Sequence, residues 1–266
     1  MIISKNIHIL CSIIFFSFSC VYPENKIKEK TILADSYILI HLESNQRILE
    51  KNTKEVYPVA SITKLITAIL SKKFIKSDDS ISVPNIAVVK NNYESKAGLK
   101  SKQKFSLSNL LHALIIPSGN DAARTLEHKI NEKHNFRNES QKILQELKMK
   151  DSNFEEAVGT SSNSKSSSED LIIILKYIAQ NHSDLIEIMK LEKGIIKSFD
   201  GDRLEFDSRN KIHDYEGFQI YGKTGTTKKA GQCFAGFIQK GKERWLLVLL
   251  GSKDYVKDIK TMVKSI

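Results

Sequence analysis

Apolar positions near the two ends of the chain follow patterns that are typical of β-strands. Residues 32–42 are rich in Ile, Leu and Tyr, and a second run begins at Arg47, beyond a polar turn at 43–46. These two runs predict a β-hairpin. Further elements are predicted near the C-terminus: strands at 218–222, 233–239 and 244–250, a turn at Gly241-Lys242, and a closing helix over 254–266.

Between these strands, apolar residues recur at helical spacing. Leu65, Ile66 and Ile69 lie on one face of a helix that is predicted from Ser61 to about Ile75. Another helix is predicted to run to Ile130, with Asn120 or Asp121 as its N-cap. Four further helices are predicted over 106–115, 140–149, 168–180 and 183–191. The link from the last helix to Asn210 is expected to be short. This order predicts an α/β fold of the α+β type, with one sheet built from both chain ends and an inserted helical subdomain.

Composition and charge narrow the class of protein. The chain has 266 residues, of which 41% are hydrophobic and 27% charged, as in ordinary globular domains. Residues 21–30 are polar, so we expect a linker there and a single domain over 31–266, with the helical insertion at roughly 76–195. The net charge of +10 favours anionic partners. Nucleic-acid binding is not expected, because the basic residues are mixed with acidic ones and no nucleic-acid motif is present.

The first 20 residues have the pattern of an export segment. Lys5 precedes an apolar stretch over 7–18, and the small residues Ser17 and Ser19 stand just before Cys20. The stretch is too short for a comfortable membrane span. Cys20 resembles a lipoprotein processing site, although Ser17 stands where such sites usually have Leu. Lipidation of Cys20, simple cleavage and a retained anchor are therefore three open outcomes. In each, the domain is exported to the periplasm or the extracytoplasmic face of a membrane, and any attachment runs through the N-terminus.

Beyond the export segment, Cys233 is the only cysteine, so no internal disulfide is expected. A lone thiol in such an apolar setting is typical of a small buried residue rather than a nucleophile. No cluster of Cys and His residues has metal-ligand spacing, so no metal site is predicted.

The first candidate for catalysis is the pair Ser61 and Lys64, which are three residues apart. On a helix this spacing places both side chains on one face. A serine hydroxyl becomes a good nucleophile when a base removes its proton. A lysine can be that base when burial and nearby positive charge keep it neutral. The Ser61 backbone N–H, at a helix start, can help bind an oxyanion.

Two further motifs follow in order. In Ser118-Gly119-Asn120, Ser118 can pass a proton and Asn120 can bind a peptide amide, although a simple helix cap explains the same residues. In Lys223-Thr224-Gly225, Lys223 and a Thr224 or Thr226 hydroxyl can bind a carboxylate. Gly225 lets a substrate backbone lie against the strand edge, although a glycine turn is the plainer explanation.

The three motifs in this order, with Val59-Ala60, Asp121-Ala122-Ala123 and Lys229-Ala230-Gly231 around them, resemble the D-alanyl-D-alanine carboxypeptidases. These are low-molecular-mass penicillin-binding proteins within the penicillin-binding protein and serine β-lactamase superfamily. The resemblance covers residues 31–255. It implies a transpeptidase-like fold whose antiparallel sheet is built from both chain ends.

The resemblance also implies an activity: penicillin-sensitive removal of the terminal D-alanine from peptidoglycan stem peptides, through an acyl-enzyme on Ser61. Lys64 is then the base, and Ser118 helps to protonate the departing D-alanine. The implied substrate-binding residues are Asn120, Lys223, Thr224, Gly225 and Thr226, with the N–H groups of Ser61 and Thr226 holding the oxyanion. The chemistry needs no metal or organic cofactor, and β-lactam antibiotics are the expected inhibitors.

Three alternatives stay open. A D,D-endopeptidase, which cuts cross-links, shares every motif. A class A β-lactamase shares the three motifs and also needs a glutamate that activates the deacylating water, usually in a Glu-x-x-Leu-Asn motif. Glu155 and Glu156 lie at a comparable distance past Asn120 but lack the Leu-Asn. A non-catalytic wall-binding module would keep the fold with a silent site.

Overall fold

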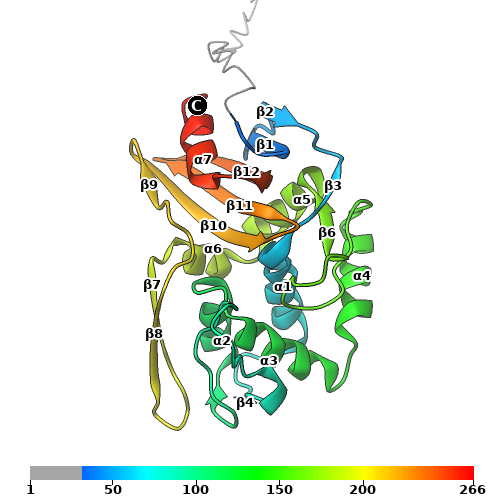
Figure 1. The fold of residues 1–266 in the computed structure, drawn as a ribbon, viewed down its shortest axis with the longest axis vertical. Helices are drawn as coiled ribbons and strands as arrows, with labels where there is room; N and C mark the ends of the chain where they lie inside the picture. The colour runs from blue at the N-terminus through cyan, green and yellow to red at the C-terminus, as the bar shows by residue number, and fades with distance from the viewer. Residues whose placement is uncertain (1–31) are drawn as a thin grey trace, which may run out of the picture.

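The computed structural model describes residues 32–266 (Figure 1). The predicted export segment and linker, residues 1–30, lie outside this range. Within residues 32–266, no helix combines the length and apolar character that a membrane crossing requires.

The centre of the fold is a six-stranded antiparallel sheet in the order β2-β1-β12-β11-β10-β9 (Figure 1). Strands β1 (Ser36–His41) and β12 (Glu243–Ser252) lie side by side, with Ile38 opposite Val248. The prediction of one sheet built from both chain ends is therefore confirmed. The remaining strands of this sheet are β2 (Arg47–Lys51), β9 (Asp214–Tyr215), β10 (Phe218–Thr227) and β11 (Gly231–Lys240).

Both faces of this sheet are covered, and β12 shows why its sequence is almost continuously apolar. Leu246, Val248 and Leu250 pack into the core shared with the helical part. The alternate residues Leu247 and Leu249 pack into a second core under α7 (Tyr255–Val263). Successive side chains of a strand point to opposite faces, so a strand with two buried faces needs apolar residues at every position.

The helical part lies against the other face of the sheet. Its central helix, α1 (Lys64–Phe74), is buried along its first eight residues, from Lys64 to Ser71. Around it lie α2 (Leu107–Ile115), α3 (Asn120–Asn131), α4 (Phe136–Glu146), α5 (Ser168–Asn181) and α6 (Ser183–Lys190) (Figure 1). Because α1 has no exposed face over these turns, its sequence is apolar almost all round.

Several predicted boundaries were wrong. The helix predicted from Ser61 begins with a short 3-10 turn, η2 (Ala60–Thr63), and α1 follows it. The helix predicted over 140–149 is α4, which starts earlier because the Asn135 side chain caps it by accepting a hydrogen bond from Asn138 N. Strand β10 extends past 222 and includes the whole Lys223-Thr224-Gly225 motif.

The link between α6 and Asn210, which was expected to be short, contains a hairpin. Strands β7 (Lys193–Lys197) and β8 (Arg203–Asp207) pair in register and project beside α2 as a two-stranded ribbon (Figure 1). Smaller pairs join β3 (Val56–Pro58) to β6 (Lys165–Ser167), and β4 (Ile81–Ser82) to β5 (Lys104–Phe105). A 3-10 turn, η3 (Asn85–Ala87), follows β4.

Candidate active site

Ser61 lies in the η2 turn, between the end of β3 and the start of α1. The turn is tight: Ala60, just before Ser61, has a φ of +49°, which is unusual for a residue with a side chain. Lys64 is the first residue of α1, and its Nζ lies 2.9 Å from Ser61 Oγ. The predicted pairing of these two side chains on one helical turn is therefore present, at hydrogen-bond distance.

Lys64 is fully buried and lies within hydrogen-bond distance of three neutral groups. Its Nζ lies 2.9 Å from Ser61 Oγ, from Asn120 Oδ1 and from the carbonyl oxygen of Val158. Burial lowers the pKa of Lys64 to about 7, although the carboxylates of Glu156 and Asp121 act in the opposite direction. A large share of Lys64 is then neutral near pH 7, which is the form that can accept a proton from Ser61.

The second lysine comes from the sheet. Lys223 on β10 is 1% exposed, and its Nζ donates to Ser118 Oγ at 2.8 Å and to Thr224 O at 2.7 Å. Burial is the main cause that holds the pKa of Lys223 well below its ordinary value, followed by the positive charges of Lys64 and Arg209. Ser118 stands in the turn between α2 and α3, with a φ of +58°. The structure thus brings together α1, the α2–α3 turn and β10.

The Ser118-Gly119-Asn120 turn does contain the cap of helix α3, but its side chains also contact the two lysines. The N-cap of α3 is Gly119, which has no side chain to accept a hydrogen bond, so the prediction of Asn120 or Asp121 as the cap was wrong. The Asn120 amide instead contacts Lys64. The Asp121 carboxylate accepts hydrogen bonds from the backbone N–H groups of Ala97, Gly98, Leu99 and Ala122.

Gly225 has a packing role that sequence reasoning did not anticipate. A Cβ atom at this position would lie 2.9 Å from both Ser61 N and Val59 O. Glycine therefore lets β10 approach the backbone that carries Ser61. Thr224 is half-buried and Thr226 is exposed on the same strand. Because Gly225 lies against Ser61 N, the backbone N–H of Ser61 is close to the part of β10 that contains Thr226.

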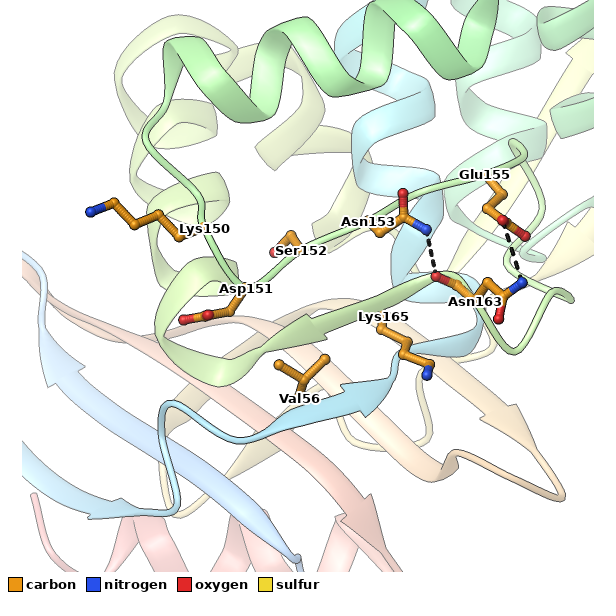
Figure 2. Close-up of a pocket in the computed structure, with 8 residues that line it drawn as sticks. All are labelled: Val56, Lys150, Asp151, Ser152, Asn153, Glu155, Asn163 and Lys165. Carbon is orange, nitrogen blue, oxygen red and sulfur yellow. Dashed lines mark hydrogen bonds between the residues drawn. The ribbon is translucent and has the colours of Figure 1, made fainter.

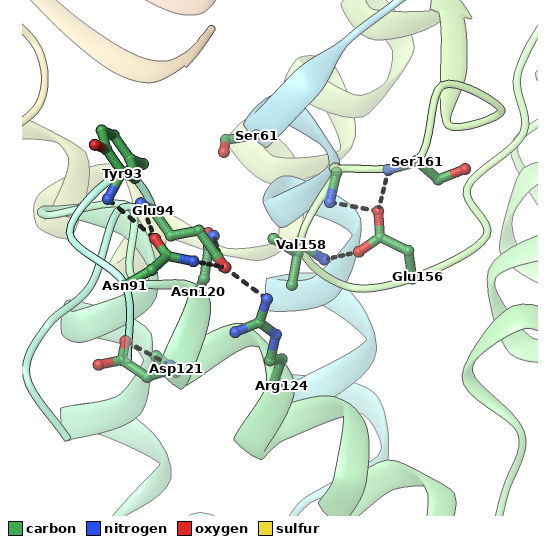
Figure 3. A network of polar contacts seen from close by, with 12 residues as sticks. Ser61, Asn91, Tyr93, Glu94, Asn120, Asp121, Arg124, Glu156, Val158 and Ser161 are labelled. Carbon is green, nitrogen blue, oxygen red and sulfur yellow. Dashed lines mark hydrogen bonds and ion pairs between the residues drawn. The ribbon is translucent and has the colours of Figure 1, made fainter. Parts of the chain in front are cut away.

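A loop at 155–163 closes another side of the site. Both oxygens of Glu156 accept backbone hydrogen bonds, from the N–H groups of Val158, Gly159 and Ser161 (Figure 3). Glu155 accepts a hydrogen bond from Ser161 Oγ at 2.7 Å. The two glutamates considered for a class A β-lactamase thus hold the loop that presents the Val158 carbonyl to Lys64.

Glu94 and Arg124 also belong to the site, although no motif pointed to them. Asn120 Nδ2 donates to Glu94 Oε2 at 2.9 Å, and Arg124 donates to the same oxygen at 2.6 Å (Figure 3). Glu94 is 26 residues from Asn120 in the sequence, and it comes from a loop with no regular spacing. Only the fold shows that these groups meet.

A separate cleft lies away from this site, between β3 and the segment that leads from α4 to β6 (Figure 2). Its lining includes Val56, Ser152, Asn163 and Lys165, and none of the predicted site residues. Within residues 32–266, no group of three or more His, Cys, Asp or Glu side chains is arranged to hold a metal ion. Cys233 is buried, and burial raises the pKa of its thiol to about 11, as suits an unreactive residue.

Comparison with known proteins identifies the family. The model of the D-alanyl-D-alanine carboxypeptidase family, peptidase S11, matches residues 23–254. The chain belongs to this family. It is 29% identical to a D-alanyl-D-alanine endopeptidase of Haemophilus influenzae over 78% of this chain and 71% of that protein. It is 26% identical to D-alanyl-D-alanine carboxypeptidase DacF of Bacillus subtilis, over 82% of this chain but only 57% of DacF.

Solved structures confirm the fold. A cysteine-to-alanine mutant of the Streptomyces K15 DD-transpeptidase superposes with a TM-score of 0.80 at 21% identity, covering 88% of this chain and 98% of that one. Penicillin-binding protein D2 of Listeria monocytogenes, in its ampicillin-bound form, gives a TM-score of 0.73 at 23% identity, covering 88% and 96%. The predicted α/β fold with a transpeptidase-like antiparallel sheet is therefore correct.

Proposed function

We propose that this S11-family chain is a serine D-Ala-D-Ala carboxypeptidase that removes the terminal D-alanine from peptidoglycan stem peptides. The observation that carries the proposal is the buried Lys64 amine, 2.9 Å from Ser61 Oγ, with a pKa lowered to about 7. A nucleophile and a base that is partly neutral near pH 7, at this distance, are what acyl transfer by a serine requires. Family membership supplies the substrate class.

In the first step, Ser61 Oγ attacks the carbonyl carbon between the two D-alanines, and its proton passes to Lys64 Nζ. The backbone N–H groups of Ser61 and Thr226 stabilise the oxyanion that forms. The C–N bond then breaks, and the departing amine takes the proton that Lys64 received, passed on through Ser118, whose hydroxyl accepts a hydrogen bond from Lys223 at 2.8 Å. The products are an acyl-enzyme on Ser61 and free D-alanine.

In the second step, water attacks the ester carbonyl while Lys64 Nζ takes one of its protons, and the oxyanion again forms between the same two N–H groups. The ester bond to Ser61 Oγ breaks, and Lys64 Nζ, 2.9 Å away, returns that proton to the oxygen. The stem peptide leaves one residue shorter, and the enzyme returns to its starting state.

The free edge of β10 suits an extended peptide. Strand β9 pairs only with Phe218 and Gln219, so among the described residues no strand pairs with this edge over 221–227. A stem peptide can add there as a further strand. Its terminal carboxylate would meet Lys223 and the Thr224 hydroxyl, and Asn120 would bind a peptide amide.

A D,D-endopeptidase remains the second candidate, because a relative at 29% identity carries that name. The two activities differ in what lies beyond the scissile bond. Incubation with monomeric pentapeptide fragments and with cross-linked dimers, followed by mass spectrometry, separates them. We expect free D-alanine from the monomers at the faster rate, and none from Ser61→Ala. Preferential cleavage of the dimers would favour the endopeptidase.

β-Lactam antibiotics fit the same site. A β-lactam presents a strained amide and a carboxylate, so Ser61 would open the ring while Lys223 and Thr224 hold the carboxylate. The ampicillin-bound form of the Listeria protein D2, which shares this fold, supports the assignment of such drugs as inhibitors.

We also propose that the chain acts outside the cytoplasm, because its substrate lies there and residues 1–20 have the pattern of an export segment. Cell fractionation and the intact mass of the mature protein test this. A mass increase that disappears in Cys20→Ser would identify lipidation. A mass that corresponds to the full chain, recovered from the cytoplasm, would contradict export.

A further inference from the structure

Asn120 connects the base of the reaction to a carboxylate on the other side of its amide. Its Oδ1 accepts a hydrogen bond from Lys64 Nζ at 2.9 Å. Its Nδ2 donates one to Glu94 Oε2 at 2.9 Å (Figure 3). An amide has an acceptor end and a donor end. A flipped amide would turn its NH₂ group toward the Lys64 amine and its oxygen toward the Glu94 carboxylate. Glu94 therefore selects the orientation that Lys64 needs.

Glu94 is itself held from two further directions. Arg124 donates to Glu94 Oε2 at 2.6 Å, and Asn91 Nδ2 donates to Glu94 Oε1 at 2.7 Å. These hydrogen bonds lower the pKa of Glu94, with the bond from Asn120 as the largest cause. The side chains of Glu94 and Arg124 are 27% and 30% exposed, so the pair is only partly screened by solvent. Glu94 is thus an ionised acceptor with a defined position.

The backbone attaches the Glu94 loop to the same helical turn that carries Asn120. Ser95 O accepts a hydrogen bond from Asn120 N at 2.9 Å. Beyond Ser95, the N–H groups of Ala97, Gly98 and Leu99 donate hydrogen bonds to the carboxylate of Asp121, the residue after Asn120. The loop and the first turn of α3 therefore form one unit, and Glu94 cannot move away from Asn120 without breaking these bonds.

We propose that Glu94 is a positioning residue of the active site. It fixes the amide of Asn120 so that Oδ1 faces Lys64, while Arg124 and Asn91 fix Glu94. One N–H of the Asn120 side-chain amide donates to Glu94, and the other can donate to the substrate. The inference rests on the proposed function only in requiring that Ser61 be acylated.

Loss of Glu94 has two predicted effects. Without its acceptor, the Asn120 amide can rotate, so the maximal rate of Ser61 acylation should fall by roughly 10- to 100-fold, as for a buried hydrogen bond that loses one partner. The negative charge of Glu94 also acts to raise the pKa of Lys64. Its removal should therefore move the acidic limb of the pH profile to lower pH.

The experiment measures the second-order rate of acylation by a fluorescent penicillin across the neutral pH range. Four proteins are compared: wild type, Glu94→Ala, Glu94→Gln and Glu146→Ala. Glu146 pairs with Lys73 on the surface, away from the site, so its loss removes the same charge without touching Asn120. Gln at position 94 keeps an oxygen acceptor without the charge, so it should restore much of the rate while retaining the shifted pH limb. Thermal unfolding of each variant monitors folding.

A slower Glu94→Ala with a shifted limb, partial rescue by Gln, and a wild-type profile for Glu146→Ala are the expected results. A wild-type rate and limb in Glu94→Ala would overturn the proposal. So would a slower rate with an unshifted limb and no rescue by Gln, because that is the behaviour of a merely structural residue. Absence of acylation in the wild type would instead refute the proposed function.

Discussion

Two buried lysines dominate the site at the scale of single residues, and neither forms an ion pair with any residue in 32–266. The hydrogen-bond acceptors of Lys64 and Lys223 are hydroxyl, amide and carbonyl oxygens. A buried ammonium without a counterion is costly, so the free energy favours the neutral amine. Sequence spacing was enough to predict Ser61 and Lys64 as a pair, because a helical turn determines where they meet. It could not predict Glu94, because loop contacts have no period.

The depressed pKa of Lys64 predicts the pH dependence of acylation. Only the neutral amine can accept the Ser61 proton, so the acylation rate should rise with pH through about 7, the pKa of Lys64. Stopped-flow measurement of penicillin acylation at a series of pH values tests this. The range from about pH 6 to about pH 8 covers one unit on either side of this pKa. An acylation rate that stays constant over that range would contradict a base role for Lys64.

The same pKa predicts how stability depends on pH. The folded pKa of Lys64 is about 7 against an ordinary value of 10.5, so between these values the unfolded chain binds the extra proton. The free energy of unfolding should then rise with pH across this window, by up to about 1.4 kcal/mol per pH unit for one such group. In Lys64→Met this contribution disappears, and the dependence should be flatter. Urea unfolding of both proteins near neutral pH and in mildly alkaline buffer measures the difference, and parallel curves would contradict it.

At the scale of elements, glycines set the distances between the strand, the loop and the turn that form the site. Gly159 has a φ of +87°, and a Cβ there would lie 2.0 Å from Ala60 O. Sequence patterns found most helices and five of the six strands of the central sheet, but not the two-residue strand β9. They did not find the β7–β8 hairpin, whose exposed and buried residues alternate over only five positions in each strand. They placed the start of α4 too late, because its first two turns are polar apart from Phe136 and so have no apolar periodicity.

Gly159→Ala tests this close packing, with Gly201→Ala as its matched control. Gly201, in the β7–β8 turn, has a similar φ of +92°, but nothing lies within 4 Å of a Cβ built there. The control should lose about 1–2 kcal/mol of unfolding free energy from backbone strain alone. Gly159→Ala should lose more and should also acylate more slowly, because the collision displaces the turn that carries Ser61. Equal effects of the two substitutions would show that the contact does not matter.

At the scale of the whole molecule, the fold places its catalytic groups where a sheet meets a helical bundle. Strand β10 supplies Lys223, the buried helix α1 supplies Lys64, and the α2–α3 turn supplies Ser118. The sheet needs both chain ends, because β1 pairs with β12. This architecture was predictable, since strand-like patterns occur at both ends and helical ones between them. The packing that gives each lysine its environment was not, because it depends on loops from distant parts of the chain.

The central claim is that Ser61 is an acylable nucleophile in a D-Ala-D-Ala carboxypeptidase site. Intact mass after incubation with benzylpenicillin, for wild type and Ser61→Ala, tests it most directly. We expect a single lasting adduct on the wild type and none on the variant, as slow deacylation predicts. No adduct with the drug intact would mean a silent site. Consumption of the drug without a lasting adduct would mean β-lactamase activity, and either result would contradict the account.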